Sequence, residues 1–486
     1  MLAVVLFFSA CGAYWLWQYL TTSSDEPPLY PGSLPVIGHA LNKHLFSELW
    51  SHMNDVGNES YKVGGVIKMK YLFHTVYVIT DPDEMTTIAN SCLEKDKYYN
   101  FAKPWVGDGL ITSKVSIWKQ HRKLLNPAFS QTVLDSFLGV FNSQSRKLVK
   151  DIEKEVGKGP FNHWSYIRLN ALQTICLTAF GVDFTDTVLT NKFMEALDLM
   201  FNILLRRFSK LWLHNRYIFK LSKLIKERNA CLKILHNTSD TVWTIICLFF
   251  SFFFGILWLC GPKFKAFMDL LLELSLEKSV LSDREIRQHI DTMVVAGHDT
   301  SANVLMFTIL SLGSHPEIQE KIVAEINEVL GDEDRDLEKQ DLSQLVYLDA
   351  VIKESLRIHT IVPIVARQLE RNIKLKNSTL LAGRTCILFL SGLHRHPVWG
   401  SDRHQFRPER WLDPSQLPDN PNAFAAFGVG RRACIGKAYA IMSMKTTLAH
   451  LLRHYRIKAD DSKLQVKMDT MLKPESGYYV SMERRT

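Results

Sequence analysis

One cysteine constrains this chain more than any other residue. It lies in the loop FGVGRRACIG, residues 427–436, which is followed by the apolar, helix-forming run KAYAIMSMKTTLAHLL. The pattern predicts a glycine-rich loop that delivers Cys434 to the first turn of a helix, where backbone N–H groups lower the pKa of a thiol. Gly430 permits a tight turn, and Gly436 permits close approach of the backbone to whatever the sulfur binds. A lone cysteine after a turn would instead be interpreted as a buried structural residue.

The loop contains more than a lone cysteine, because five of its residues form a fixed pattern: Phe427, Gly430, Arg432, Cys434 and Gly436. This pattern resembles the haem-binding signature of the cytochrome P450 superfamily. The resemblance implies a mainly α fold with small β-sheets, in which Cys434 is the axial thiolate of haem b. It also implies that Arg432 binds a haem propionate and that Phe427 packs near the sulfur. A thiolate ligand favours cleavage of the O–O bond at the iron.

A second motif interrupts the apolar stretch at 292–310, TMVVAGHDTSANVLMFTIL. A glycine inside a helix costs about 1 kcal/mol relative to alanine, so its presence invites a reason. Ala296 and Gly297 are small enough to let a flat cofactor and O2 lie against the helix. A packing glycine beside a solvated aspartate explains the residues equally well. The stretch resembles the oxygen-binding helix of the superfamily, which implies that Asp299 and Thr300 deliver protons.

A third motif pairs Glu354 with Arg357, three positions apart on one helix face. Surface pairs of this kind are common and stabilise a helix by under about 1 kcal/mol. Together with Arg410 in FRPERW, however, they resemble the ExxR helix of the superfamily and its arginine partner. The resemblance implies a structural lock that takes no part in the chemistry.

Three further residues match positions that bind haem propionates in the superfamily. Trp118 and Arg122 lie four positions apart on one face of a helix that breaks at Pro127. An ordinary amphipathic helix would show the same spacing. The resemblance implies that both contact propionates, and that Arg367 supplies another propionate ligand.

Other chemistries find little support in the sequence. The eight cysteines are widely spaced and form no CxxC pair, which argues against zinc, iron–sulfur clusters and a disulfide framework. His394 and His396 have no third ligand at a useful spacing, so we interpret them as turn residues. The net charge of +8 is not concentrated in a dense basic tract, and we expect no binding to nucleic acid.

Several segments together resemble family 4, the fatty-acid ω-hydroxylase-like group of the insect type. Many members of that group carry a glutamate that esterifies a haem methyl, where this chain has Ala296. We therefore expect a haem that is not covalently attached. The implied reaction is monooxygenation of a small apolar substrate, such as a fatty acid, a hormone-like lipid or a xenobiotic, with O2 and electrons from NADPH.

The electrons must come from a separate protein, because the chain has no dinucleotide or flavin fingerprint. The resemblance implies NADPH–cytochrome P450 reductase, with cytochrome b5 as a second donor. Six basic residues could form the docking face, although a solvated basic surface is the alternative. They are Lys119, Arg122, Lys123, Arg431, Lys437 and Lys445.

The chain begins with an uncharged stretch, residues 2–20, which we interpret as an uncleaved membrane anchor within residues 1–20. A Pro/Gly-rich linker follows at 21–39, and a haem-thiolate catalytic domain is expected at 40–486. Helical periodicity dominates this domain, with strands near 62–80, 385–390 and 455–485. We expect a single anchor in the endoplasmic reticulum membrane, a cytosolic catalytic domain and contact with membrane lipid.

Residues 242–260, VWTIICLFFSFFFGILWLC, do not fit that organisation. The stretch is long and apolar enough to span a bilayer, but it occupies the place of a polar surface segment. A second span, a membrane-dipping element and a buried core helix are all possible interpretations. We expect an error in the sequence, such as translated intron. Two further functions stay open: a catalytically silent haem-binding protein or product of a faulty gene model, and a haem-thiolate isomerase that uses no O2.

Overall fold

The computed structural model describes residues 9, 12–13, 25–40, 49–72, 74–183, 187–257, 267–274, 280–331 and 333–485. The chain forms two compact units. Unit 1 comprises Met1–Lys97, Val362–Gln405 and Ser415–Ala433, and unit 2 comprises Tyr98–Ile361, Phe406–Pro414 and Cys434–Thr486. The sequence predicted one catalytic domain at 40–486. The predicted anchor at 1–20 lies almost entirely outside the described residues.

Unit 1 is built on a four-stranded sheet with the order β1-β2-β7-β4, in which only the β2–β7 pair is parallel. Its strands are β1 (Val66–Tyr71), β2 (His74–Ile79), β7 (Thr385–Phe389) and β4 (Ile364–Gln368). A two-stranded sheet pairs β5 (Ile373–Lys374) with β6 (Thr379–Leu380), and the helices are α3 (Leu49–Lys62), α4 (Pro82–Ser91) and α18 (Leu390–His394).

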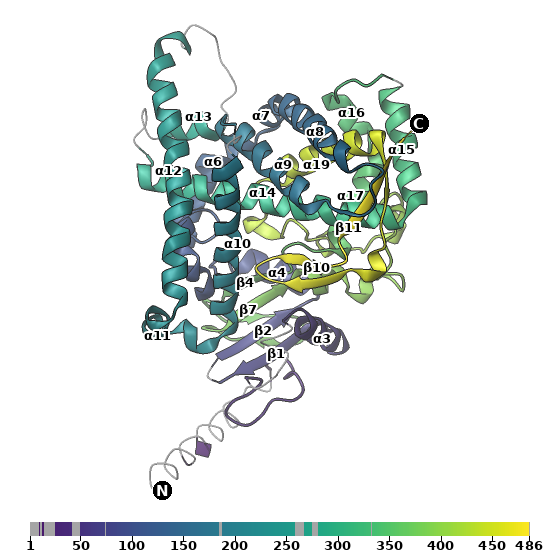
Figure 1. Ribbon diagram of the computed structural model, residues 1–486. Helices are drawn as coiled ribbons and strands as arrows, with labels where there is room; N and C mark the ends of the chain where they lie inside the picture. Colours follow the sequence, from purple (N-terminus) through teal and green to yellow (C-terminus); the bar gives the residue numbers. More distant parts are fainter. Residues whose placement is uncertain are drawn as a thin grey trace. The chain divides into compact units, whose positions relative to one another are not determined.

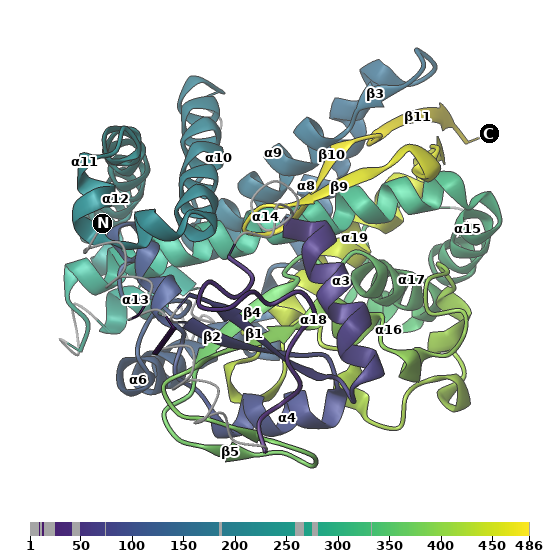
Figure 2. The ribbon, with the colours of Figure 1, turned by 90° about the horizontal axis from the view of Figure 1, so that it is seen from below.

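The two faces of this sheet are covered by different helices because strand side chains alternate between faces. Ile67 and Val78 pack with Met53 and Val56 of α3 on one face. Figure 2 shows α3 beside the strands. Val66, Tyr77 and Ile79 point to the opposite face, where they pack with apolar residues of α4. A register slip of one residue would exchange the two sets, so the alternation specifies the pairing.

The predicted linker does not act as a spacer over the part that the structure describes. Tyr30 donates its backbone N–H to Lys68 O at 2.8 Å, and Lys68 returns a backbone hydrogen bond to Pro28 O. The Lys68 ammonium also pairs with Glu26 at 2.8 Å, with both side chains buried. Prolines tolerate an edge position, where the missing N–H is not needed. Residues 28–30 therefore extend the edge of the sheet at β1.

Unit 2 is mainly helical (Figure 1). Its helices are α5 (Lys103–Val106), α6 (Val115–Leu125), α7 (Gln131–Ser136), α8 (Leu138–Ile152), α9 (Trp164–Ile175), α10 (Thr187–Ser209), α11 (Arg216–Leu221), α12 (Leu224–Leu257), α13 (Phe267–Leu272), α14 (Asp283–Ser314), α15 (Pro316–Leu330), α16 (Lys339–Gln344), α17 (Val346–Ile358) and α19 (Lys437–His454). Its strands are β3 (Phe161–Asn162), β8 (Tyr455–Lys458), β9 (Gln465–Met468), β10 (Leu472–Ser476) and β11 (Tyr479–Arg484).

The centre of unit 2 is α14, which packs against α9, α12, α17 and α19. A capping box starts this helix: the Ser282 side chain accepts from the Glu285 backbone, and the Glu285 side chain accepts from Ser282. Pro316 follows its end and begins α15. Among the described residues, α14 is the one helix long and apolar enough to cross a membrane. Most of it is buried inside the protein, as expected for a core helix.

Helix α12 extends to Leu257 and so runs through most of the apolar stretch 242–260. The reason is local: the helix contains no proline, and Gly255 near its end is its one glycine. Its first half is fixed to α14, because Ser239 donates to Asp291 at 2.5 Å. Residues 258–260 lie outside the described residues.

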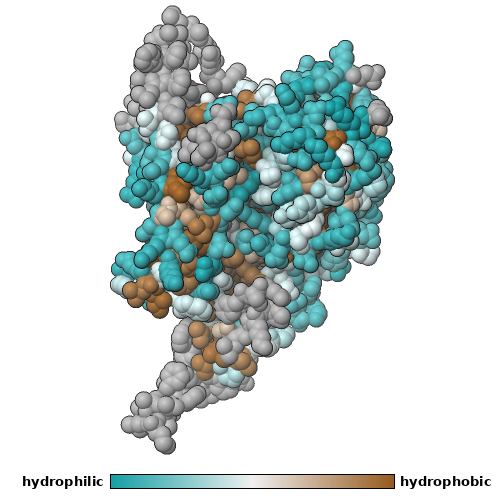
Figure 3. Space-filling model, in the orientation of Figure 1, coloured by the Kyte–Doolittle hydropathy of each residue, from teal (hydrophilic) through white to brown (hydrophobic). Residues whose placement is uncertain are grey.

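An apolar patch lies at the end of α10 and on α11. Its exposed members are Trp212, Tyr217, Ile218 and Leu221, and Leu221 is 89% exposed. Figure 3 shows hydrophobic side chains gathered at the lower left, where Figure 1 places α11. Beneath the patch, the Arg207 guanidinium lies between the rings of Phe101 and Phe219 at 4.1 and 4.0 Å. This stacking holds α10 and α11 together.

Candidate active site

The loop before Cys434 is fixed by α4. Gly430 has a φ of +68°, and a Cβ there would lie 2.8 Å from Asn90 Oδ1 and 2.9 Å from Ala89 O. Glycine is therefore required both for the backbone conformation and for close approach to the end of α4. Upstream, Ala425 donates its N–H to Nε2 of the buried His394 at 2.9 Å. His396 instead caps a turn by accepting from the Val398 N–H.

Cys434 precedes α19 and does not lie in its first turn as predicted, since the helix begins at Lys437. The predicted lowering of its thiol pKa is also wrong. Burial raises the pKa, and it outweighs a backbone hydrogen bond from Gly436 and the positive charge of Arg122. The side chain is nevertheless accessible.

Gly436 keeps one side of the sulfur open. A Cβ at this position would lie 3.9 Å from Cys434 Sγ and 4.0 Å from Phe129, which are ordinary contacts. Protein packing alone therefore does not require the glycine. Its missing side chain leaves space beside Sγ, as a flat group bound to the sulfur would require. Phe427, in the preceding loop, is partly accessible.

Two of the predicted propionate ligands lie on α6. Trp118 is buried, and Arg122 is partly accessible and donates from Nε to Asn126 Oδ1 at 2.9 Å. Burial lowers the pKa of Arg122, while the nearby Cys434 raises it. Arg122 is thus close enough to Cys434 for each charge to act on the pKa of the other group.

The other predicted propionate ligands, Arg367 and Arg432, belong to unit 1 and share their surroundings with a lysine. Burial lowers the pKa of Lys95 well below its usual value, and the charges of Arg367 and Arg432 lower it further. The Arg367 side chain is 2% exposed, and its Nε has no hydrogen-bond partner among the described residues. No motif pointed to Lys95, because a single lysine in the polar run LEKDK carries no pattern.

In the middle of α14, the accessible residues coincide with the predicted oxygen-helix motif. Ala296, Gly297 and Thr300 keep accessible surface, while His298 and Asp299 are fully buried. Thr300 Oγ1 donates to Ala296 O at 2.6 Å, so its hydroxyl stays on this face. Of the two explanations that the sequence offered for Gly297, the packing one is supported: a Cβ there would lie 2.8 Å from the Ile175 side chain of α9. The glycine permits close packing of α9 on α14.

Asp299 points into a cluster of buried charges. Its Oδ1 lies 3.3 Å from Arg168 Nε and its Oδ2 3.5 Å from Lys473 Nζ, and both cations also pair with Asp198. His298 Nε2 is 3.9 Å away. Burial raises the pKa of Asp299, but the charges of Lys473, His298 and Arg168 together lower it. The interpretation of Asp299 as a solvated residue is therefore wrong.

Glu354, Arg357 and Arg410 form a fully buried trio. Glu354 accepts from Arg357 Nε and Nη2 at 2.9 and 2.7 Å and from Arg410 Nε at 3.0 Å. The Trp411 indole and the Arg407 backbone N–H donate to the same carboxylate. These hydrogen bonds tie α17 to the segment around Pro408–Trp411.

Lys445 does not belong to the docking face that the sequence suggested. Lys445 is 7% exposed, donates to Leu342 O and lies 3.2 Å from Asp349. Helix α19 is buried on most sides, so a lysine in its middle turns toward an internal partner. The other five residues are exposed or partly accessible.

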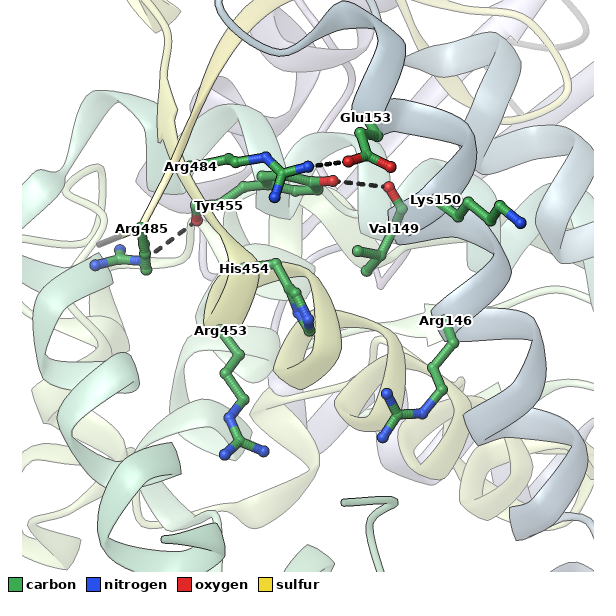
Figure 4. A pocket seen from close by; sticks show the side chains of 9 residues that line it. All are labelled: Arg146, Val149, Lys150, Glu153, Arg453, His454, Tyr455, Arg484 and Arg485. Carbon is green, nitrogen blue, oxygen red and sulfur yellow. Dashed lines mark hydrogen bonds and ion pairs between the residues drawn. The ribbon is translucent and has the colours of Figure 1, made fainter. Parts of the chain in front are cut away.

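A basic pocket of about 290 Å³ lies elsewhere in unit 2 (Figure 4). The Arg146 guanidinium is paired with Asp334 and Asp336, and that of Arg485 with Glu320. No predicted site residue lines the pocket, so it is distinct from the predicted haem site. Its lining residues are Arg146, Val149, Lys150, Glu153, Arg453, His454, Tyr455, Arg484 and Arg485.

Comparison with known proteins decides the family. Residues 27–482 match the family described as Cytochrome P450. The chain belongs to the cytochrome P450 family. It is thus an enzyme of a family that typically consists of monooxygenases, and the family implies a thiolate-ligated haem and a redox partner.

Curated relatives of this cytochrome P450 belong to family 4. The protein is 31% identical to mouse Cytochrome P450 4V2, with 96% of this chain and 91% of the relative covered. It is 30% identical to Cytochrome P450 4c3 of Drosophila melanogaster, over 94% and 89% of the two chains. It is 31% identical to Cytochrome P450 4c21 of Blattella germanica, over 91% of each chain. The sequence-based recognition of the superfamily and of family 4 is confirmed.

Proposed function

We propose that this cytochrome P450 is a haem-thiolate monooxygenase in which Cys434 is the axial ligand. The observation that carries the proposal is the exposed residue Cys434, whose thiol is acted on by the charge of Arg122 and has no side chain beside it at Gly436. Haem b, when bound, supplies the iron at which O2 is activated. Its binding displaces water from the thiol, and the positive charge of Arg122 favours the thiolate.

We assign the binding of the haem propionates to three arginines and to Trp118. Arg122, Arg367 and Arg432 present guanidinium groups, which match the geometry of a carboxylate. Arg367 has a buried Nε whose hydrogen-bonding capacity is unused among the described residues, and a carboxylate would satisfy it. The residues present therefore fit haem b. Residue 296 is an alanine, whereas a glutamate at this position could form an ester with the haem. This supports a haem that is not covalently attached.

Proton delivery is assigned to Thr300 and Asp299. Thr300 keeps its hydroxyl proton on Ala296 O and presents the oxygen on the accessible face of α14. Asp299 is one residue away, with its carboxylate held by Arg168 and Lys473. Because the carboxylate points into that cluster, Asp299 must rotate away from Lys473 before it can exchange a proton with water near Thr300.

The substrate class is assigned from family 4 relatives. We infer medium-to-long apolar chains, such as fatty acids, as substrates. The NADPH–cytochrome P450 reductase, assisted by cytochrome b5, would dock on the exposed cations Lys119, Lys123, Arg431 and Lys437. Lys445 is excluded from this surface by its burial.

The membrane assignment rests on two features. The uncharged residues 2–20 are long enough to anchor the chain in the endoplasmic reticulum membrane. The exposed apolar residues of α11 lie among Arg216, Lys220 and Lys223, and cations beside apolar side chains favour an anionic lipid surface.

A reduced CO-difference spectrum tests the assignment of Cys434. We expect the band typical of thiolate-ligated haem in the wild-type protein and its loss in C434S. The matched control is C231S, at a buried cysteine on α12. NADPH-driven hydroxylation of laurate with added reductase then tests the reaction. Retention of the thiolate band by C434S would overturn the ligand assignment. A normal band without NADPH-driven oxidation of any apolar probe would instead favour a catalytically silent haem protein.

A further inference from the structure

We propose that Arg207 and Arg228 bind the carboxylate of a fatty-acid substrate. The inference rests on the proposed function and adds a recognition site for the charged end of the substrate, which none of the motifs indicated. Arg207 lies near the end of α10 and Arg228 in the first turns of α12, and both belong to unit 2. Figure 1 shows α11 beside these ends of the two helices.

The Arg207 guanidinium is held in place by contacts that leave most of its hydrogen-bonding capacity unused. The ring centroids of Phe101 and Phe219 lie 4.1 and 4.0 Å from its Cζ. Its Nε donates to Leu213 O at 3.3 Å, and among the described residues Nη1 and Nη2 have no hydrogen-bond partner. The stacking and the single hydrogen bond fix the position of the group, but they do not neutralise its charge.

Arg228 adds a second positive charge at the same place. Its Cζ lies 5.5 Å from the centroid of the Phe219 ring, and its guanidinium donates to the side chain of its neighbour Asn229. Burial and the charge of Arg228 lower the pKa of Arg207 to about 10. No carboxylate of the described residues forms an ion pair with either arginine.

Other buried arginines of this unit have acidic partners. Arg168 pairs with Asp198, and both Arg357 and Arg410 pair with Glu354. Arg207 is also buried, with 9% of its surface exposed, but it has no such partner in the part of the chain that the structure describes. Withdrawing a guanidinium from water without a counter-charge is unfavourable, and a bound anion offsets this effect.

A carboxylate attached to an apolar chain fits these surroundings. The two Nη groups match the two oxygens of a carboxylate and would donate charge-assisted hydrogen bonds to them. The exposed apolar residues Trp212, Tyr217 and Ile218 follow closely in the sequence, after α10 and on α11. A fatty acid can use both features, whereas an inorganic anion can use only the charge.

The position of Arg207 along α10 also suits a chain of medium length. Asp198, nine residues before Arg207, lies near Lys473, and Lys473 lies near Asp299 beside Thr300. Nine residues of helix separate two levels by about 13 Å along the helix axis. The carboxylate is therefore held away from the accessible face of α14, and the far end of a medium-to-long chain is the part that reaches it. This arrangement predicts oxidation near the end of the chain opposite the carboxylate.

The test compares laurate with methyl laurate, which has the same chain but no charge. Equilibrium dialysis of the full-length, haem-loaded protein without NADPH measures the binding of both compounds to wild type, R207M, R228M and R206M. Arg206 is the adjacent, exposed arginine of α10 and provides the matched control. We expect R207M to bind laurate about tenfold more weakly, because charge-assisted hydrogen bonds are lost. R228M should weaken laurate binding to a smaller extent, R206M should equal wild type, and methyl laurate should bind equally to all four proteins.

Two outcomes overturn the inference alone. Binding of laurate by R207M and R228M with the wild-type affinity would show that these arginines do not recognise the carboxylate. Equal weakening of laurate and methyl laurate in R207M would show that Arg207 only supports the fold. R228M gives an independent result where R207M fails to fold, since Arg228 is partly accessible. Failure of the wild-type protein to bind either compound, with its thiolate spectrum intact, would instead overturn the proposed substrate class, and this inference with it.

Discussion

The carboxylate of Asp299 lies 3.5 Å from the ammonium of Lys473, which connects the core helix α14 to the C-terminal hairpin β9–β10. Lys473 is the largest of the charges that lower the pKa of Asp299. A residue of the proposed proton path is thus fixed by a strand that lies far from it in the sequence.

Replacing Lys473 by Met should destabilise the protein by about 3 kcal/mol at pH 7, because it leaves a buried carboxylate with one partner fewer. The pKa of Asp299 is lowered in the folded state, so its contribution to stability is present above its unfolded pKa of about 3.9 and is lost as the pH falls. The penalty of K473M should therefore shrink as the pH falls from 7 towards 3. Urea unfolding at several pH values measures the penalty and its dependence on pH. K463M is the control, because Lys463 forms an exposed pair with Asp460. An equal penalty in K463M would contradict the role of Lys473.

The Asp291→Asn variant should be more stable than wild type at high pH. Burial raises the pKa of Asp291 to about 7, so the folded protein pays to ionise it. This cost is absent below about pH 4, grows between pH 4 and 7, and then stays constant. D291N should thus gain up to about 4 kcal/mol at pH 8 and nearly nothing at pH 4. Urea unfolding at several pH values measures the difference, with D151N, at an exposed aspartate of α8, as control. A gain independent of pH would exclude this explanation.

Replacement of Arg410 by Met should cost about 3–5 kcal/mol of unfolding free energy, because it breaks a buried ion pair with Glu354. R410K should cost less, since it keeps the charge. The exposed Arg431 provides a control, and R431M should change stability by less than about 0.5 kcal/mol. Urea midpoints compare the three variants. A loss below 1 kcal/mol in R410M would show that the buried trio does not stabilise the fold.

Haem should be fully extractable from the wild-type protein with acidified butanone, because Ala296 cannot form an ester. After incubation with NADPH and reductase, A296E should retain part of its haem through extraction. A296Q has the same length but no carboxyl group, so its haem should be extracted fully. Mass spectrometry of the extracted protein measures the attached haem. Retention by wild type or by A296Q would contradict the expectation.

A spin label on L221C should enter lipid when the full-length protein is reconstituted into anionic vesicles. Leu221 is 89% exposed and apolar, and it belongs to the patch on α11. A label on V346C provides the control, since Val346 is also an exposed apolar residue but begins α17. Accessibility to oxygen and to a water-soluble nickel complex should place the first label in lipid and the second in water. Equal aqueous accessibility of both labels would argue against contact of this patch with membrane.

The sequence predicted the residues whose pattern is local. Gly430 could be identified because a tight turn before a cysteine needs a positive φ. The Glu354–Arg357 spacing likewise predicted a shared helix face, and the resemblance supplied Arg410 as the distant partner. Family membership followed from the same short motifs.

Other features depend on which residues pack against a side chain, and a local sequence pattern does not contain that information. The direction of the Asp299 carboxylate depends on Lys473 from a distant hairpin, and burial of Lys445 depends on how α19 is covered. The pKa of Cys434 was predicted in the wrong direction because desolvation by surrounding residues outweighs local hydrogen bonding. The lowered pKa of Lys95 likewise depends on its burial and on Arg367 and Arg432, which the fold brings close to it.

The contact between Gly297 and Ile175 limits how this enzyme can diversify. Any side chain at position 297 would meet α9, so substitutions on this accessible face that spare both the helix packing and the proposed proton-delivery residue Thr300 are steered to position 296. Evolution can therefore retune selectivity on this helix through few sites, while the spacing of the two helices is inherited unchanged. A library aimed at new substrates gains most by leaving Gly297 and Ile175 fixed and varying the residues beside them.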